Sequence, residues 1–249
     1  MLTQPLLDKL VQLRLPAFRN GLQEQLNNPQ YAELSFEERL SILVDLEITR
    51  RHDRRIQRLI KLASFPQSVS LEDLDLSPSR GLERRFVFEV AQCNWIDRHL
   101  NLLVLGPTGS GKSFLSCVFG LSACRCGHSV RYFRTSRLLF RLAQSHLDGS
   151  FTDLLANLAK IDLLILDDWM RDPISPSETR DLLEIFDDRF GRVSTLISSQ
   201  VPVGEWFQRF PDPTHSDAIM DRIVHNAYRI NLEGDSQRKV RSVITMPSI

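Results

Sequence analysis

Residues 101–114, NLLVLGPTGSGKSF, join an apolar run to a glycine-rich segment that ends in Lys-Ser. Residues 106–113, called the phosphate loop below, fit the pattern G-x-x-x-x-G-K-[ST], whose backbone N–H groups surround phosphate oxygens. The apolar run before the loop predicts a strand and the residues after it predict a helix, which is the context that this motif requires. The helix N-terminus adds partial positive charge. The stretch therefore predicts a site for a nucleoside triphosphate.

The roles within this site follow from the motif. Lys112 is expected to hold the β- and γ-phosphates of ATP, and Ser113 is expected to ligate Mg²⁺. The residues predicted to bind the nucleotide are Gly106, Pro107, Thr108, Gly109, Ser110, Gly111, Lys112, Ser113 and Phe114.

From residue 101 onwards, apolar runs of strand length alternate with helical patterns. The runs are residues 102–105, 130–133, 163–166, 195–198 and 227–232, and the helical patterns lie near 112–125, 136–147, 151–159, 177–190 and 217–225. This alternation predicts a parallel sheet with helices on both faces. We therefore expect an α/β domain over residues 81–249, built on a five-stranded parallel sheet.

The first 63 residues have a different pattern, with little glycine and with leucines at three- and four-residue steps. Residues 50–61, RRHDRRIQRLIK, place six basic side chains within an arc of about 140° of one helix. Apolar residues upstream project onto that same side, so the helix either breaks near Glu47 or changes its packing partner there. We expect a helical domain over residues 1–63 and a Ser- and Pro-rich linker over residues 64–80.

Polar residues follow two further predicted strands. LLILDDWM, residues 163–170, ends a buried strand in two acids, and the carboxyl ends of parallel strands face the ligand crevice. Asp167 is expected to complete the magnesium shell, and Asp168 to orient or activate the attacking water. TLISSQ, residues 195–200, ends in Gln200, the first candidate to sense the γ-phosphate, with Ser199 as the next. The acid-bearing strand and the polar-ended strand together disfavour a simple kinase and favour an ATPase with an additional strand.

Composition restricts the partners and the location of the chain. Its 31 basic residues balance its 31 acidic ones, so net charge gives no general argument for a nucleic-acid or membrane partner. The four cysteines lack the spacing of a zinc site and are expected to be reduced thiols. The chain shows no signal-peptide pattern and no stretch as long as a membrane span. We expect a cytoplasmic protein without a membrane partner.

Segments along nearly the whole chain resemble the IstB-type ATP-binding proteins of insertion sequences, which are AAA+ ATPases of the initiator and helicase-loader group. Besides the phosphate loop, they are LSFEERL (34–40), SLEDLDL (70–76), RGLERR (80–85), CNWI (93–96), LLILDDW (163–169), RDLLEIFDDRFG (180–191), TLISSQVPVGEW (195–206) and DPTHSDAIMDRIVHNAYRINLEGDSQRK (212–239). The resemblance implies ATP-dependent homo-oligomers that assemble on double-stranded target DNA with little sequence preference and deform it. It also implies a partner transposase of the same insertion sequence and disassembly driven by ATP hydrolysis.

The resemblance also implies contacts between subunits. It marks Arg222 as an arginine finger that enters the ATP site of the neighbouring subunit. About seventeen residues follow the last predicted strand, which is too few for the helical lid of many AAA+ proteins. The arginine usually carried by that lid is therefore missing or replaced, and Arg238 is the candidate for this nucleotide contact in trans.

For DNA, the resemblance implies a path along an insert after the second strand. The candidates there are Arg134, Arg137 and Arg141, and a second set, from the N-terminal basic stripe, is Arg50, Arg54 and Arg58. Mobile cations along a groove suffice for phosphate contacts. A solvated helix face remains the alternative interpretation of both sets.

Other functions remain open at this stage. A replicative helicase loader of the same fold would bind a hexameric helicase and prefer single-stranded DNA. A nucleotide-gated scaffold would hydrolyse ATP only incidentally, and the predicted roles of Asp167, Asp168 and Arg222 argue against it. A small-molecule kinase is the least favoured, because no acceptor site or lid is evident.

Overall fold

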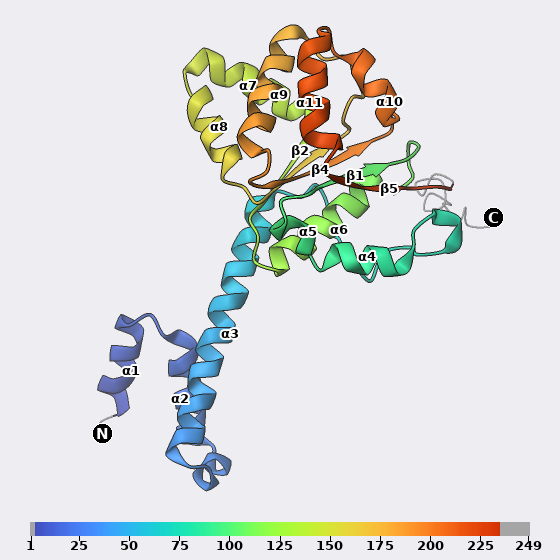
Figure 1. The fold of residues 1–249 in the computed structure, drawn as a ribbon. Helices are drawn as coiled ribbons and strands as arrows, with labels where there is room; N and C mark the ends of the chain where they lie inside the picture. Colours follow the sequence, from blue (N-terminus) through green and yellow to red (C-terminus); the bar gives the residue numbers. More distant parts are fainter. Residues whose placement is uncertain (1–2, 235–249) are drawn as a thin grey trace, which may run out of the picture. The chain divides into compact units, whose positions relative to one another are not determined.

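The computed structural model describes residues 3–234 of the chain. It divides into two compact units, Met1–Arg58 and Leu59–Ile249. The first unit contains helices α1 (Thr3–Gln12) and α2 (Pro16–Asn27), the 3₁₀ helix η1 (Pro29–Glu33) and most of helix α3 (Phe36–Ala63). The larger unit contains the sheet and the helices that cover it (Figure 1).

Helices α2 and α3 lie close together within the first unit. A Cβ atom added at Gly21 would lie 2.8 Å from side-chain carbons of both Leu43 and Leu46, so glycine permits this approach. The carboxylate of Glu47 accepts the backbone N–H of Ala17 at 2.9 Å, beside the first residue of α2. An anion at this end of α2 pairs with N–H groups that the helix itself leaves unsatisfied.

Helix α3 does not break near Glu47, where the sequence left two alternatives open. It continues to Ala63, and its last turns place Leu59 and Ala63 in the hydrophobic core of the larger unit. The change of packing partner is therefore the alternative that the structure adopts. Helix α3 contributes buried residues to both units, Leu43 to the first and Leu59 and Ala63 to the larger one.

Residues 64–80, expected to be a linker, lie against the larger unit. They contain one short 3₁₀ helix, η2 (Pro78–Arg80), and Phe65, Val69, Leu71, Leu74 and Leu76 pack against its core. The two compact units meet at Arg58 and Leu59, five residues before the expected end of the helical domain. Serine and proline disfavour regular structure in this stretch, but its apolar side chains still gain free energy by burial.

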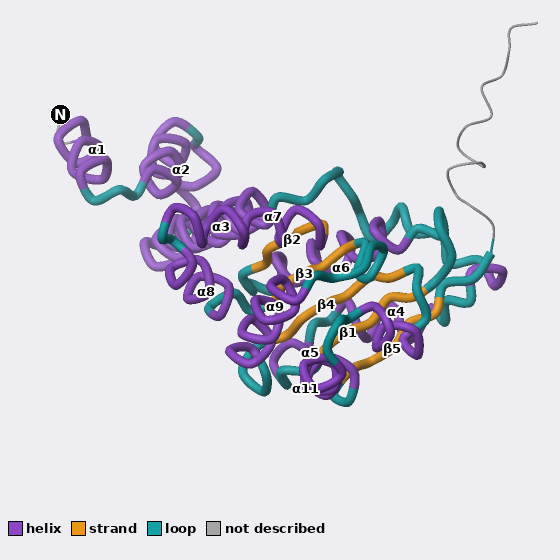
Figure 2. Tube along the Cα trace, turned by 90° about the horizontal axis from the view of Figure 1, so that it is seen from above, coloured by secondary structure: helices purple, strands orange, loops and turns teal. Residues whose placement is uncertain are grey.

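The sheet has five parallel strands: β1 (Asn101–Leu105), β2 (Val130–Arg134), β3 (Leu163–Asp167), β4 (Ser194–Ser199) and β5 (Ala227–Asn231). Their order is β2-β3-β4-β1-β5, with every neighbouring pair parallel (Figure 2). The five-stranded parallel sheet predicted from the sequence is therefore confirmed. Because β4 lies between β1 and β3, the ends of these three strands meet at one edge of the sheet.

Alternate residues of each strand enter two separate hydrophobic cores, as the pleat of a strand requires. In β1, Leu102 and Val104 join one core and Leu103 joins the other. The first core contains α4 (Arg84–Ala91), α5 (Asn94–Asp97), α6 (Lys112–Arg125) and the end of α3. The second contains residues of α7 (Thr135–Asp148), α8 (Phe151–Ala159), α9 (Pro176–Arg189), α10 (Val203–Trp206) and α11 (Pro213–Val224), so helices cover both faces (Figure 1). The 3₁₀ helix η3 (Phe207–Arg209) lies between α10 and α11 in the chain.

Strand β5 is the last element of the described part of the chain. Residues 235–249, which include the predicted trans contact Arg238, lie outside the described residues. Within residues 3–234, no helix has both the length and the apolar composition that a membrane span needs.

Candidate active site

The phosphate loop connects β1 to α6 in backbone conformations that favour glycine. Gly109 and Gly111 have φ angles of 81° and 92°. At Gly106, an added Cβ atom would lie 2.6 Å from the carbonyl oxygen of Leu232. Side chains at these positions would strain or displace the backbone. Because α6 begins at Lys112, the loop lies at the N-terminus of this helix, where the helix dipole adds partial positive charge.

Lys112 lies inside the curl of this loop and is only 8% exposed. Its Nζ donates to the backbone oxygens of Gly106 and Pro107, each at 2.8 Å. A bound phosphate would compete with these two carbonyl groups for the same ammonium group. The lysine is thus held where the motif places the phosphates.

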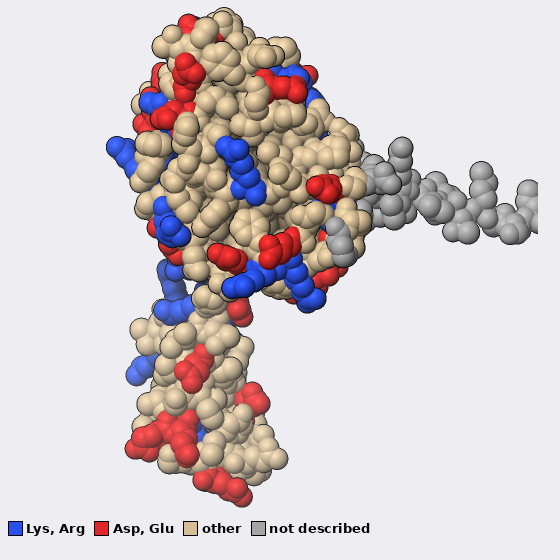
Figure 3. Space-filling view, turned by 45° about the vertical axis from the view of Figure 1, so that its right-hand side comes forward, with Lys and Arg blue, Asp and Glu red and all other residues tan. Residues whose placement is uncertain are grey.

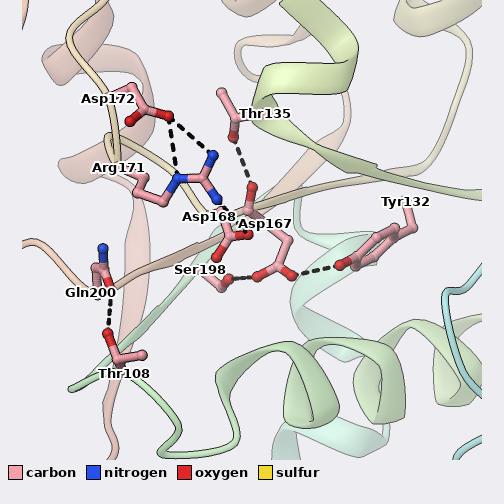
Figure 4. A network of polar contacts seen from close by, with 9 residues as sticks. All are labelled: Thr108, Tyr132, Thr135, Asp167, Asp168, Arg171, Asp172, Ser198 and Gln200. Carbon is pink, nitrogen blue, oxygen red and sulfur yellow. Dashed lines mark hydrogen bonds and ion pairs between the residues drawn. The ribbon is translucent and has the colours of Figure 1, made fainter.

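Asp167, at the end of β3, is buried in a network of hydroxyl groups (Figure 4). One carboxylate oxygen accepts the Tyr132 hydroxyl at 2.5 Å, and the other accepts the hydroxyl of Ser198. Burial, and then the hydrogen bond to Asp167, raise the pKa of Tyr132, so the phenol stays protonated and donates. The neighbouring strands β2 and β4 therefore hold the Asp167 carboxylate from both sides.

Asp168 turns out of the sheet in a conformation that is uncommon for a residue with a side chain. Its φ is 57°, and that of Met170 is 56°. Between them lies Trp169, which is fully buried. Its backbone N–H donates to the backbone oxygen of Ser198 at 2.9 Å, and its ring packs edge-on against Trp206. Left-handed conformations of such residues persist where surrounding contacts enforce them, and they cluster at functional sites.

The side chain of Asp168 is 41% exposed. Nη1 of Arg171 lies 3.8 Å from the Asp168 carboxylate, and Arg171 also pairs with Asp172 at 3.1 Å (Figure 4). The two adjacent acids thus differ in environment. Asp167 is enclosed and hydrogen-bonded, whereas Asp168 is accessible to solvent.

The two candidates at the end of β4 also separate. The Gln200 carbonyl oxygen accepts the hydroxyl of Thr108, so Gln200 contacts the phosphate loop directly (Figure 4). Ser199 is buried and donates to the backbone oxygen of Trp169 at 2.8 Å. Gln200 is therefore the one of the two that faces the loop, while Ser199 secures the turn after β3.

A cavity of about 350 Å³ lies over the loop and the strand ends. The residues of the predicted site that line this cavity are Thr108, Gly109, Gly111, Lys112, Ser113, Phe114, Asp167, Asp168 and Gln200. Residues that precede the sheet in the chain also line the cavity, among them Pro66, Leu74 and Leu82. The cavity lies entirely in the larger unit.

The donors in this cavity suit ATP and magnesium. The Ser110 hydroxyl is buried near Gly106 without a hydrogen-bond partner, which leaves a donor inside the curl of the loop. The oxygen donors Ser113 and Asp167 match the preference of Mg²⁺ for oxygen and for few protein ligands beside phosphates and water. Among residues 3–234, no group of three His, Cys, Asp or Glu side chains forms another candidate metal site.

Arg222 lies at the opposite end of β1 from the loop. The side chain of Asn101, the first residue of β1, donates to the backbone oxygen of Arg222 at 3.0 Å. The Arg222 guanidinium pairs with Asp187 of α9 and donates to the Ala218 oxygen at 2.7 Å. Arg222 thus does not join the active site of its own subunit.

The arginines predicted to bind DNA lie in different surroundings. Arg134 lines the nucleotide cavity, although it was predicted to bind DNA. Arg137 and Arg141 are exposed on α7, and on α3 Arg54 and Arg58 are exposed while Arg50 is half-buried. The sequence could not separate Arg134 from the others, because only the pairing of Arg134 with Asp167 across β2 and β3 brings it to the site.

The residues at the site without a predicted role include Tyr132 and Arg80. Tyr132 holds Asp167, and Arg80 reaches the cavity from the stretch expected to be a linker. The only signal for Arg80 was its place in RGLERR, a segment of the family resemblance without an assigned function. Tyr132 required knowledge that β2 and β3 are neighbours.

Comparisons with known proteins agree with this geometry. The model of the family described as IstB-like ATP binding protein matches residues 8–244. The chain is 41% identical over 239 residues to the insertion sequence ATP-binding protein y4pL of Sinorhizobium fredii, covering 96% of this chain and 98% of the relative. It is 44% identical over 219 residues to the insertion sequence IS1162 ATP-binding protein of Pseudomonas fluorescens, covering 86% and 95%. The crystal structure of DnaI aligns with a TM-score of 0.58 at 20% identity, covering 71% of this chain and 93% of DnaI, and shows the same fold.

Proposed function

Since the chain belongs to the family of IstB-like ATP binding proteins and is an AAA+ ATPase, we propose that it assembles with ATP on double-stranded target DNA and assists a transposase of the same insertion sequence. The observation that carries the proposal is the family match over residues 8–244, which includes both compact units. Such an assembly would deform the DNA and would act in the cytoplasm.

Within one subunit, we assign roles by position. The loop N–H groups and Lys112 bind the phosphates, and Ser113 and Asp167 hold Mg²⁺, Asp167 through water because hydroxyl groups already contact both of its oxygens. Mg²⁺ would neutralise charge on the phosphates. The accessible Asp168 orients the attacking water, and Gln200 senses the γ-phosphate and transmits its presence through Thr108.

Arg222 acts between subunits in this proposal. Its distance from the phosphate loop along β1 argues against a role in its own site, and its guanidinium lies on the surface formed by α9 and α11. If the Arg222 guanidinium moved from Asp187 to the phosphates bound by a neighbouring subunit, one ion pair would be replaced by another. Hydrolysis would then require assembly, and its completion would release the subunits from the DNA.

Arg222→Ala is expected to retain ATP binding and to lower DNA-stimulated turnover by about 10- to 100-fold, because only assembled sites use the finger. Mixing it with Asp168→Asn, which keeps its own Arg222, is expected to restore part of the turnover. Asp187→Ala is the matched control, since it breaks the same ion pair but keeps the arginine. If Arg222→Ala and Asp187→Ala lost turnover equally, and mixing with Asp168→Asn restored none of it, Arg222 would have only a structural role.

DNA contacts are proposed at local clusters of basic residues. In the view of Figure 3, basic and acidic side chains are interspersed over the surface, which agrees with the balanced charge of the chain. Arg137 and Arg141 lie on the exposed side of one helix, α7, with the same spacing of four residues as Arg54 and Arg58 on α3. Phosphate contacts need no base-specific geometry.

The double variant Arg137→Ala/Arg141→Ala is expected to weaken duplex binding and to lower the slope of log affinity against log salt by about 2, one unit for each lost phosphate contact. ATP binding is expected to stay unchanged. The variant Arg54→Ala/Arg58→Ala provides the comparison with equal loss of charge. A change of slope only in the latter would move the proposed DNA path to α3.

The function itself is tested by gel shift on duplex and single-stranded DNA of equal length, with and without ATP. Large complexes on any duplex that form only with ATP are expected. A preference for single strands, together with capture of a hexameric helicase, would favour a helicase loader. Complexes that form only with ATP but hydrolyse none of it, even with DNA and transposase present, would favour a nucleotide-gated scaffold.

A further inference from the structure

Arg80 is a buried cation in the wall of the nucleotide cavity. Its side chain is 7% exposed although it belongs to η2, in a stretch with little regular structure. Arginine is almost never buried to this extent unless it is paired. Its guanidinium contacts mainly backbone oxygens. Among residues 3–234, the one carboxylate within ion-pair distance is that of Asp75, 3.9 Å from Nε.

Those backbone oxygens belong to two parts of the site. Nη2 donates to the carbonyl oxygen of Ser110 in the phosphate loop, and Nη1 donates to that of Glu233, after β5, at 3.4 Å. Arg80 and Glu233 are also joined through their backbones, because the backbone N–H of Glu233 donates to the backbone oxygen of Arg80 at 3.0 Å. Arg80 therefore connects the loop to the chain that leaves β5.

The loop itself is shaped around this contact. A Cβ atom added at Gly111 would lie 3.1 Å from Nη2 of Arg80, closer than almost all such contacts in proteins. The carbonyl group of Ser110 and the N–H group of Gly111 belong to one peptide unit, and a planar trans peptide points these two groups in opposite directions. A donor that holds the Ser110 oxygen on one side directs the Gly111 N–H to the other.

We propose that Arg80 is a positioning residue for ATP, which orients the peptide between Ser110 and Gly111 so that the loop N–H groups converge on the phosphates. Its charge adds to that of Lys112 at the same cavity. Arg80 acts before the chemical step and within one subunit, so its role is independent of DNA and of assembly.

The test uses the full chain. It measures the Kd of ADP without DNA, and the KM and kcat for ATP with saturating duplex DNA. Arg80→Gln is expected to raise the KM for ATP and the Kd of ADP by about 10- to 100-fold, the equivalent of one charge-assisted contact. The kcat is expected to change by less than about threefold, because Arg80 contacts the phosphate loop and acts on nucleotide binding. Arg80→Lys is expected to recover part of the affinity, since one ammonium group can reach the Ser110 oxygen.

Arg85→Gln is the matched control, because it removes an exposed arginine five residues away. Thermal unfolding of each variant separates a loss of affinity from a loss of fold. The proposal is overturned by an unchanged KM in a folded Arg80→Gln protein. It is also overturned by an equal fall of kcat, or by an Arg80→Lys protein that is as stable as the wild type and binds no better than Arg80→Gln. None of these results would bear on the gel-shift test of the proposed function.

Discussion

Asp168→Asn is expected to bind ATP normally and to hydrolyse it about 10³-fold more slowly, within the range for loss of a group that orients or deprotonates the nucleophile. The side chain of Asp168 is accessible at the cavity, whereas hydroxyl groups occupy both oxygens of its neighbour Asp167. Asparagine keeps the size of the side chain but removes its charge. Steady-state release of phosphate and equilibrium binding of ATP measure the two properties separately.

The substitution is also expected to preserve the fold. Position 168 has a φ of 57°, and asparagine tolerates this left-handed conformation better than most residues. With ATP bound and hydrolysis blocked, complexes on duplex DNA are expected to persist in the gel shift. Asp172→Asn serves as the control, because it removes an exposed acid that also pairs with Arg171. Normal turnover in Asp168→Asn would rule out the assigned role.

Lys112→Ala is expected to weaken ATP binding by about 10²- to 10⁴-fold, since two charge-assisted contacts to phosphates of about 1.5–3 kcal/mol each are removed. The lysine is buried at the loop, so no other lysine can replace it there. Without bound ATP, the variant is expected to form no large complexes on DNA. Titration with a fluorescent ATP analogue, followed by the gel shift, measures both effects.

The carbonyl groups of Gly106 and Pro107 lose a donor in Lys112→Ala, so the fold of the variant needs its own check by circular dichroism. Lys160→Ala, which removes an exposed lysine outside the nucleotide cavity, is the control. ATP binding close to that of the wild type in a folded Lys112→Ala protein would contradict the nucleotide site. ATP-independent complexes on DNA would contradict only the proposed link between nucleotide and assembly.

Several parts of the site were predictable because each is local in sequence. A phosphate loop needs glycines and a helix N-terminus within eight residues, and 106–113 contains both. The acids at 167 and 168 and the glutamine at 200 follow apolar runs, and the carboxyl ends of parallel strands share one edge of a sheet. The cavity does bring these residues together. Their chemical roles remain predictions until the variants are measured.

Other features depended on contacts between distant segments. Tyr132 and Ser198 are 35 and 31 positions from Asp167, and the hydrogen bonds that they form with it require the strand order β2-β3-β4. The Ser- and Pro-rich composition of residues 64–80 indicated a linker, but packing of their apolar side chains brings Arg80 to the loop.

The sequence by itself determined the α/β class, the five strands, the phosphate loop and the acid pair, because periodicity and short motifs encode backbone conformation locally. Only the tertiary structure decided that α3 continues past Glu47, that Arg134 faces the nucleotide cavity, and that Arg222 lies away from its own site. These outcomes depend on which surfaces become buried against each other. Burial is a property of the folded chain as a whole, and no short segment of the sequence specifies its partner.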